Sequence, residues 1–550
     1  MRGKSLLAAA ILLGGAQAAS AGNHTDWLNY GGDLGQTRYT TDKQINTGNV
    51  KNLKVKYIFQ TGVIGSFENT PIVENGMMYV TTPYNHVFAL DAKTGTQKWH
   101  YEHKLGTTIF CCGPNNRGVG IDGNNVYMAT LDAMLIAINK KTGELVWETE
   151  IADPEFGYSE TLAPVVYKGK VIVGISGAEY GIRGFISAYD AKSGKKVWRW
   201  HTIPAPDEAG PDGVKGWEGT YVNKADGVNP LHRDVAAEKA AVKSGKYKDA
   251  WKYGGGSNWM TNTVDTETDI MYATLGNPSP DLDGSLRPGD NRWSDSMVAL
   301  DVNTGKLKWA YQYVPHDVWD LDSVSPPILA DAKGKNGKSQ KVVVHGGKTG
   351  WVYIHDRATG ELIRRSDPMI PHENLFALPT EGEGTRMLPG ANGGVEWSPG
   401  AYSPKTGMVY YANLHQPMHY EVKSAPWAKG KLWLGGAFKA IPGEKQWGNV
   451  VGVDLNTGKI AWEHKTAEPM IGGTLATAGG LVFTGEANGT VLGLNAKSGK
   501  VLWSFQGGAG ANAAPMSFTI DGKQHIAIAV GGNAQINAKR GDAIIVFSLD

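Results

Sequence analysis

The stretch that decides the fold reads VFALDAKTGTQKW at residues 87–99, and the chain repeats its pattern. An alternating apolar segment leads into Asp-x-x-Thr-Gly, and a second alternating segment ends on Trp99. The Asp side chain can bond the turn backbone and Gly accepts a positive φ, so each unit predicts a β-hairpin. Six further units are LIAINKKTGELVW (135–147), ISAYDAKSGKKVW (186–198), VALDVNTGKLKW (298–309), VYIHDRATGELIR (352–364), VGVDLNTGKIAW (451–462) and VLGLNAKSGKVLW (491–503).

The spacing of these units predicts the architecture. The first three tryptophans, Trp99, Trp147 and Trp198, lie roughly 50 residues apart, which is room for a four-stranded sheet with its loops. Degenerate turns at 264–269 and 403–407 fill the longer gaps. We expect an all-β, eight-bladed β-propeller in which the tryptophans dock neighbouring blades and the N- and C-terminal strands share one blade. A β-helix is the alternative, but its repeats are much shorter.

The N-terminus predicts export. Residues 1–21 read as a signal peptide, with a basic start, a short apolar core and Ala-Ser-Ala before the cleavage point. Residues 22–550 then form one periplasmic propeller without a membrane span, and 202–253 form a loop insertion with a short helix near 234–244. The formal net charge of +1 argues against nucleic acid as a partner.

The cysteines are adjacent: Cys111 and Cys112 are the only two in the chain. Their Cα atoms lie about 3.8 Å apart, below the roughly 4.4 Å minimum of an ordinary disulfide. A disulfide here closes a small strained ring that adds little to fold stability, so it suggests a stiff, flat surface for a flat ligand. Two unlinked buried thiols are the alternative.

Six motifs occur in chain order around this pair. They are Cys-Cys-x4-Arg-Gly (111–118), Thr-x-Ala-Pro (161–164), Ser-Gly-Ala-Glu (176–179), Gly-Asn-Pro (276–278), Arg-Pro-Gly-Asp-Asn-x-Trp (287–293) and Pro-His-Asp-x-Trp-Asp (315–320). With the repeats, they resemble the pyrroloquinoline quinone (PQQ) alcohol dehydrogenases, the methanol and ethanol quinoprotein dehydrogenases, over nearly the whole mature chain. The resemblance implies PQQ-dependent oxidation of primary alcohols to aldehydes.

The resemblance places PQQ between a Cys111–Cys112 disulfide and the indole of Trp259. Two flat, rigid groups sandwich a tricyclic quinone at low entropic cost. The other residues implied to line the cofactor site are Glu68, Arg117, Thr161, Ser176, Gly177, Ala178, Ser257, Lys348 and Glu396. Taken singly, each polar position is consistent with a solvated polar residue, and Trp259 alone is consistent with a core or blade-docking tryptophan.

The same resemblance implies a metal site with oxygen ligands from Glu179, Asn277 and Asp320, which suits a hard cation. Asp320 also matches the catalytic base, which takes the alcohol's hydroxyl proton. Direct hydride transfer to the quinone and addition of the alcohol to it are both consistent with these residues.

A second aspartate, Asp322, stands where calcium-using members carry Ala, Ser or Thr, and it resembles the lanthanide-dependent branch. Glu179, Asp320, Asp322 and a PQQ carboxylate would place four negative charges around one ion, which favours a trivalent cation such as La or Ce over Ca²⁺. In the alternative, Asp322 turns into solvent and the enzyme is calcium-dependent.

Three departures leave the preferred alcohol open: an extra residue near Asp281, Ile471 where the family often has Trp, and Glu396 where it has Asn or Asp. Because the chain has no Cys-x-x-Cys-His haem motif, a soluble cytochrome c is the expected electron acceptor. A homodimer is left open. A non-catalytic periplasmic propeller scaffold is the remote alternative, since it needs neither the cysteine pair nor the clustered ligands.

Overall fold

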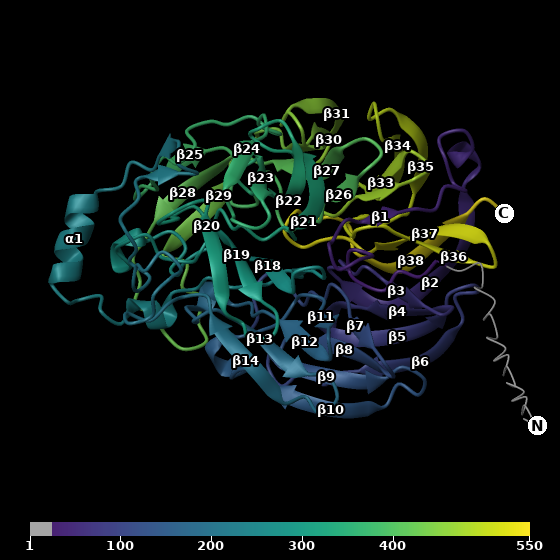
Figure 1. The fold of residues 1–550 in the computed structure, drawn as a ribbon, viewed down its shortest axis with the longest axis horizontal. Coiled ribbons are helices and arrows are strands. Elements are labelled where there is room, and N and C mark those ends of the chain that lie inside the picture. Colours follow the sequence, from purple (N-terminus) through teal and green to yellow (C-terminus); the bar gives the residue numbers. More distant parts are fainter. Residues whose placement is uncertain (1–24) are drawn as a thin grey trace, which may run out of the picture.

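The protein is described by a computed structural model that covers residues 25–550 and consists mainly of β-strands (Figure 1). The predicted signal peptide lies outside these residues.

Within residues 25–550, eight sheets have four or five strands. These strands are β2 (Lys54–Gly65) with β36 (Met516–Ile520), β37 (Lys523–Val530) and β38 (Gly541–Ser548); β3 (Ile72–Glu74), β4 (Met77–Thr81), β5 (His86–Asp91) and β6 (Gln97–Glu102); β7 (Gly120–Asp122), β8 (Asn125–Ala129), β9 (Met134–Asn139) and β10 (Leu145–Glu150); β11 (Val165–Tyr167), β12 (Lys170–Val173), β13 (Phe185–Asp190) and β14 (Lys196–His201); β17 (Thr263–Asp265), β18 (Ile270–Thr274), β19 (Ser296–Asp301) and β20 (Leu307–Gln312); β21 (Ile328–Lys333), β22 (Ser339–Gly346), β23 (Val352–Asp356) and β24 (Leu362–Arg365); β26 (Ala401–Ser403), β27 (Met408–His415), β30 (Trp447–Asp454) and β31 (Ile460–Thr466); and β1 (Tyr39–Thr40) with β32 (Leu475–Thr477), β33 (Leu481–Gly485), β34 (Thr490–Asn495) and β35 (Val501–Gln506).

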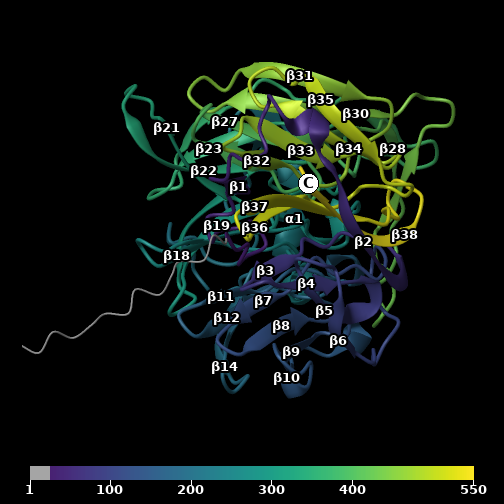
Figure 2. The ribbon, with the colours of Figure 1, turned by 90° about the vertical axis from the view of Figure 1, so that its right-hand side faces the viewer.

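The strands in these sheets pair antiparallel, except that β1 joins β32 in parallel. Most sheets use four consecutive strands. The sheet that joins segments near the two ends of the chain is different, because β2 pairs with β38 (Figure 2). The register of this pair runs from Lys54 opposite Ser548 to Gly65 opposite Gly541. Sequential antiparallel sheets closed in this way form a β-propeller, and the β-helix alternative is excluded.

Smaller elements lie in the long connections. The segment 202–253 contains β15 (Lys224–Ala225), β16 (Asn229–Pro230) and helix α1 (Val235–Lys243), where the sequence predicted a short helix. Asp234 caps α1 by accepting the Ala237 amide at 3.0 Å, and α1 projects from the sheets at the left of Figure 1. A second insertion pairs β28 (Met418–Val422) with β25 (Thr385–Met387) and β29 (Gly436–Ala440). Short 3₁₀ turns occupy Val50–Asn52, Pro83–Asn85, Pro154–Phe156, Ala178–Tyr180, Ala250–Tyr253 and Gly284–Leu286. Among residues 25–550, no helix combines the length and the apolar character needed to cross a bilayer.

The repeat tryptophans contact the turns of adjacent sheets. Trp99 of β6 donates from Nε1 to the carbonyl of Lys140, in the turn between β9 and β10, at 2.9 Å. Trp462 of β31 makes the same contact with Ala496, between β34 and β35, at 3.0 Å. In that turn Gly499 has φ +69°, and a Cβ there would lie 2.4 Å from the Trp462 ring. Glycine therefore provides both the turn conformation and the space for the indole.

This contact predicts that Gly499→Ala destabilises the protein by about 2 kcal/mol more than Gly169→Ala, because the new methyl overlaps the Trp462 ring. Gly169 is a matched control, with φ +70° and no atom within 4 Å of its Cβ position. Urea unfolding of both variants measures the difference. Equal losses would show that the tryptophan does not constrain the turn.

Candidate functional site

Loops from several sheets converge on one pocket. Its empty space is about 570 Å³, part of which opens to solvent. The connection between β6 and β7 contributes the cysteines, the connection between β20 and β21 contributes two aspartates, and the connection between β22 and β23 contributes a lysine. The wall contains Cys111, Cys112, Asn115, Arg117, Ser159, Thr161, Ser176, Gly177, Glu179, Ser257, Trp259, Asp320, Asp322, Lys348, Glu396 and Gln535.

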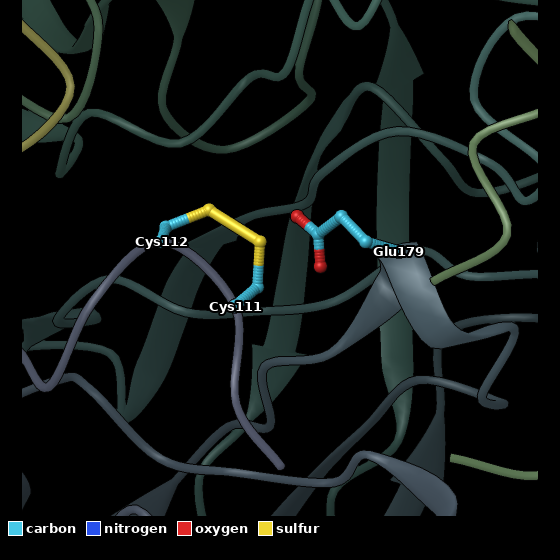
Figure 3. Close-up of side chains that lie close together, drawn as sticks. All are labelled: Cys111, Cys112 and Glu179. Atoms are coloured by element: carbon cyan, nitrogen blue, oxygen red, sulfur yellow. A yellow bond between two sulfur atoms is a disulfide. The ribbon is translucent and has the colours of Figure 1, made fainter. Parts of the chain in front are cut away.

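Cys111 and Cys112 form a disulfide, so the alternative of two unlinked thiols does not describe this structure. Figure 3 shows the carboxylate of Glu179 directed toward it, and a carboxylate oxygen lies within 4.8 Å of both sulfur atoms. Disulfide sulfurs are neutral and suit a hard cation poorly. These three residues are therefore better described as one wall of a ligand pocket than as a metal site of their own.

The position of Glu179 follows from a tight 3₁₀ turn, Ala178–Tyr180, flanked by two glycines. Gly177 has φ +113°, and a Cβ there would lie 2.2 Å from the carbonyl oxygen of Gly157. Only glycine fits this close approach. Ala178 is buried in the turn behind the pocket wall, where its carbonyl accepts a hydrogen bond from Ser279.

Aromatic rings hold Arg117 in the pocket. Its guanidinium carbon lies 5.1 Å from the ring centroid of Trp259 and 4.8 Å from that of Trp397. A guanidinium nitrogen pairs with Glu68 at 2.7 Å, and Asn533 donates to the other Glu68 oxygen at 2.7 Å. Glu68 is therefore behind Arg117 and outside the pocket wall. The buried Nε of Arg117 has no hydrogen-bond partner among the described residues, which leaves a donor for a ligand.

Thr161 joins two other predicted residues of the wall. Its hydroxyl lies 3.2 Å from that of Ser176 and donates to the carbonyl of Trp259, also at 3.2 Å. The second contact connects segments that are 98 residues apart and constrains the backbone that carries the Trp259 ring.

Lys348 is surrounded by carboxylates. Its Nζ lies 3.2 Å from Asp320, 2.8 Å from Asp322 and 3.9 Å from Glu396. Burial lowers the pKa of Lys348, but the charges of Asp320 and Asp322 outweigh it and raise that pKa well above its ordinary value. Burial raises the pKa of Asp320 well above its usual range although Lys348 opposes the shift, and burial also raises the pKa of Glu179, to about 7.

Asp322 is buried, with 4% of its surface exposed, and it lines the pocket instead of turning into solvent. One carboxylate oxygen accepts the backbone amide of Asn277 at 2.7 Å, and the other accepts Lys348. The side chain of Asn277 donates to the carbonyl of Pro278 at 3.2 Å, and Asn277 does not belong to the wall. Asn277 therefore meets the site through its backbone.

The pocket thus brings together all the predicted site residues except Glu68, Ala178 and Asn277, which lie next to it. Three wall residues were missed by the sequence analysis: Asn115, Ser159 and Gln535. Asn115 was within reach, because it follows the cysteines in the same loop. Gln535, which donates to Glu396 at 3.2 Å, comes from the connection between β37 and β38 and has no local signal.

The fold and this pocket define a ligand-binding β-propeller. The PQQ family profile described as "Glucose/ethanol/alcohol dehydrogenase, beta-propeller domain" matches residues 27–229, 232–367 and 438–526. The quinohemoprotein alcohol dehydrogenase of Comamonas testosteroni is 35% identical over 542 residues, covering 93% of this chain and 73% of that protein. Its crystal structure has a TM-score of 0.82 at 32% identity, with 96% and 80% of the two chains covered.

Two relatives from Methylorubrum extorquens also match. The lanthanide-dependent methanol dehydrogenase is 35% identical over 542 residues, covering 92% of this chain and 88% of that protein. Methanol dehydrogenase (cytochrome c) subunit 1 is 33% identical over 541 residues, covering 92% and 84%. The chain belongs to the PQQ-dependent quinoprotein alcohol dehydrogenase family.

We predict that the purified protein has no free thiol, because its two cysteines are linked to each other. Alkylation without reductant, followed by mass measurement, should leave the mass unchanged, and prior reduction should allow two additions. Two modified cysteines in unreduced, active protein would contradict the disulfide.

Proposed function

We propose that this protein oxidises primary alcohols to aldehydes with PQQ bound between the Cys111–Cys112 disulfide and Trp259. The observation that carries the proposal is that these two flat groups line one pocket, together with Arg117 and Lys348 as buried cations. PQQ bears three carboxylates, so paired cations and a free donor on Arg117 suit it. Thr161, Ser176, Gly177, Ser257 and Glu396 complete the proposed wall.

The metal is proposed to bind Glu179, Asp320 and Asp322. Four carboxylates and two cations line the pocket, counting Glu396 with these three against Arg117 and Lys348. The surplus of negative charge suits a cation, and adding a cofactor carboxylate favours a trivalent one. The lanthanide-dependent relative supports this choice, with calcium as the alternative. Asn277 is proposed to complete the ligand set.

When bound, PQQ would supply the acceptor for two electrons and the hydrogen of the carbinol carbon, and a cation held by the carboxylates would supply a Lewis acid for the quinone carbonyl. The protein's own contribution is the proton acceptor. The Asp320 carboxylate lines the pocket beside Lys348, so it can take the hydroxyl proton of the alcohol as the aldehyde forms. Lys348 holds that carboxylate in place through its contacts with the Asp320 side chain and carbonyl.

We also propose that the eight sheets act as the eight blades of one domain, in which the repeat tryptophans dock each blade to the next. The protein acts in the periplasm and passes electrons to a soluble cytochrome c, as the name of one relative suggests. A homodimer of this protein is compatible with the proposed function. A non-catalytic scaffold, in contrast, would bind no PQQ.

Asp320→Ala should lower alcohol-dependent turnover to below a few per cent of wild type, because it removes both a metal ligand and the base. The assay uses protein whose PQQ and metal contents have been measured. Asp301→Ala is the control, since this half-buried aspartate caps a repeat turn through the Asn303 and Thr304 amides. Substantial turnover by metal- and PQQ-loaded Asp320→Ala would disprove the role.

Asp322→Ser should reduce lanthanum- or cerium-supported activity by about tenfold or more, with a smaller effect on any calcium-supported activity. The reason is the loss of one negative charge from the cation site. Apo-protein mixed with PQQ is titrated with each ion, for wild type and variant. Equal activation of wild type by calcium, unaffected by the substitution, would support the calcium alternative.

A further inference from the structure

One buried carboxylate beside the pocket has no part in the proposed function. Asp317 is fully buried, and its two oxygens accept backbone amides: Oδ1 from Trp319 at 2.8 Å and Oδ2 from Leu321 at 2.9 Å. The two donors, Trp319 and Leu321, are the residues on either side of Asp320. Asp317 therefore binds the backbone on both sides of the proposed base, through the amides of the neighbouring residues.

The backbone conformation at Asp320 requires such a constraint. Asp320 has φ +59°, a left-handed conformation that is unfavourable for a residue with a Cβ. Such a conformation persists only when its surroundings over-determine it. Two charge-assisted hydrogen bonds, which one carboxylate accepts from the amides of Trp319 and Leu321, supply that constraint.

Asp317 is itself fixed from the other side. Arg287, also fully buried, donates to the backbone carbonyls of Asp317, Asp281 and Pro280. Its side chain also donates to Asn291 Oδ1 at 2.6 Å. The guanidinium thus links two loops.

The result of this conformation is visible in the pocket. Asp320 and Asp322 both direct a carboxylate to Lys348, at 3.2 and 2.8 Å, while Trp319 and Leu321 are buried in the apolar core. If φ of Asp320 relaxed to a negative value, the two carboxylates would no longer converge on one point.

We infer that Asp317 is a positioning residue for the reaction: it holds Asp320 in the left-handed conformation that makes its carboxylate available to metal and alcohol. This inference rests on the proposed function for what Asp320 does, but the grip on its backbone stands independently. Outer residues that orient metal ligands typically contribute about tenfold or more to metal affinity or activity.

Two variants separate position from charge. Asp317→Asn keeps the size but places an amide donor against one of the two N–H groups. Asp317→Glu keeps the charge but moves the carboxylate by one methylene. Asp265→Asn is the matched control, because Asp265 is also buried, accepts the Glu267 amide at 3.0 Å and pairs with Arg357 at 3.3 Å, outside the pocket.

Terbium luminescence titration of the PQQ-loaded proteins measures metal affinity, and steady-state kinetics separates kcat from KM for the alcohol. We expect both Asp317 variants to lose about tenfold or more in terbium affinity and in kcat, with KM changed less. Asp265→Asn should stay within about twofold of wild type on each measure. Wild-type terbium affinity and kcat in Asp317→Glu would show that the charge of this residue matters and the placement of its carboxylate does not, which would overturn the inference. Wild-type values in Asp317→Asn would show that Asp317 has no effect on the site, which would overturn it as well.

A crystal structure of the wild-type protein gives a test that does not depend on the folding of a variant. A positive φ at Asp320 with both Asp317 bonds present supports the inference, and a negative φ or a missing bond overturns it. If the wild-type protein binds neither PQQ nor terbium, the proposed function fails. The crystal structure would still decide whether Asp317 binds the backbone on both sides of Asp320.

Discussion

The pairing of β2 with β38 is the constraint on which the site depends. It joins residues 54–65 to residues 541–548 and closes the succession of sheets. Glu68, just after β2, then accepts a hydrogen bond from Asn533, in the connection between β37 and β38, and through Glu68 this closure supports Arg117 in the pocket. Without it, the wall would lose the segment between β37 and β38 that contains Gln535. A local contact beside the pocket therefore depends on segments that lie near the two ends of the described chain.

The pocket concentrates buried charge in a way that works against stability. Removing an ion from water costs several kcal/mol unless it is paired and hydrogen-bonded. Lys348 compensates part of the charge of Asp320, Asp322 and Glu396, and backbone amides compensate more. The remaining surplus of negative charge, with the raised pKa of Glu179, is typical of a functional site rather than of a structural ion pair. It gives a physical reason for the cation that we propose.

Local backbone conformation fixes where these charges point. Gly177 permits the close turn that presents Glu179, and no other residue fits there. Asp320 adopts a left-handed conformation despite its side chain, so an outside constraint is needed, and the amides around it are bound by Asp317. Asp317, which lies outside the pocket wall, thus constrains the backbone of a wall residue, so the wall alone is an incomplete description of the site.

The sequence by itself determined the hairpins, the sheet-rich fold, the shared terminal sheet and most of the pocket wall. The hairpins and sheets rest on signals within a few residues, namely the alternation of apolar side chains and the Asp-x-x-Thr-Gly turns, and the shared terminal sheet rests on the spacing of the repeats. The pocket wall rests on the resemblance of six motifs to the quinoprotein alcohol dehydrogenases. Only the tertiary structure decided that Glu68 lies behind Arg117, that Asn277 meets Asp322 through its backbone, and that Gln535 reaches Glu396. The physical reason is distance along the chain. Which side chains from different loops come within hydrogen-bond reach is set by how whole sheets pack, and no local pattern encodes that packing.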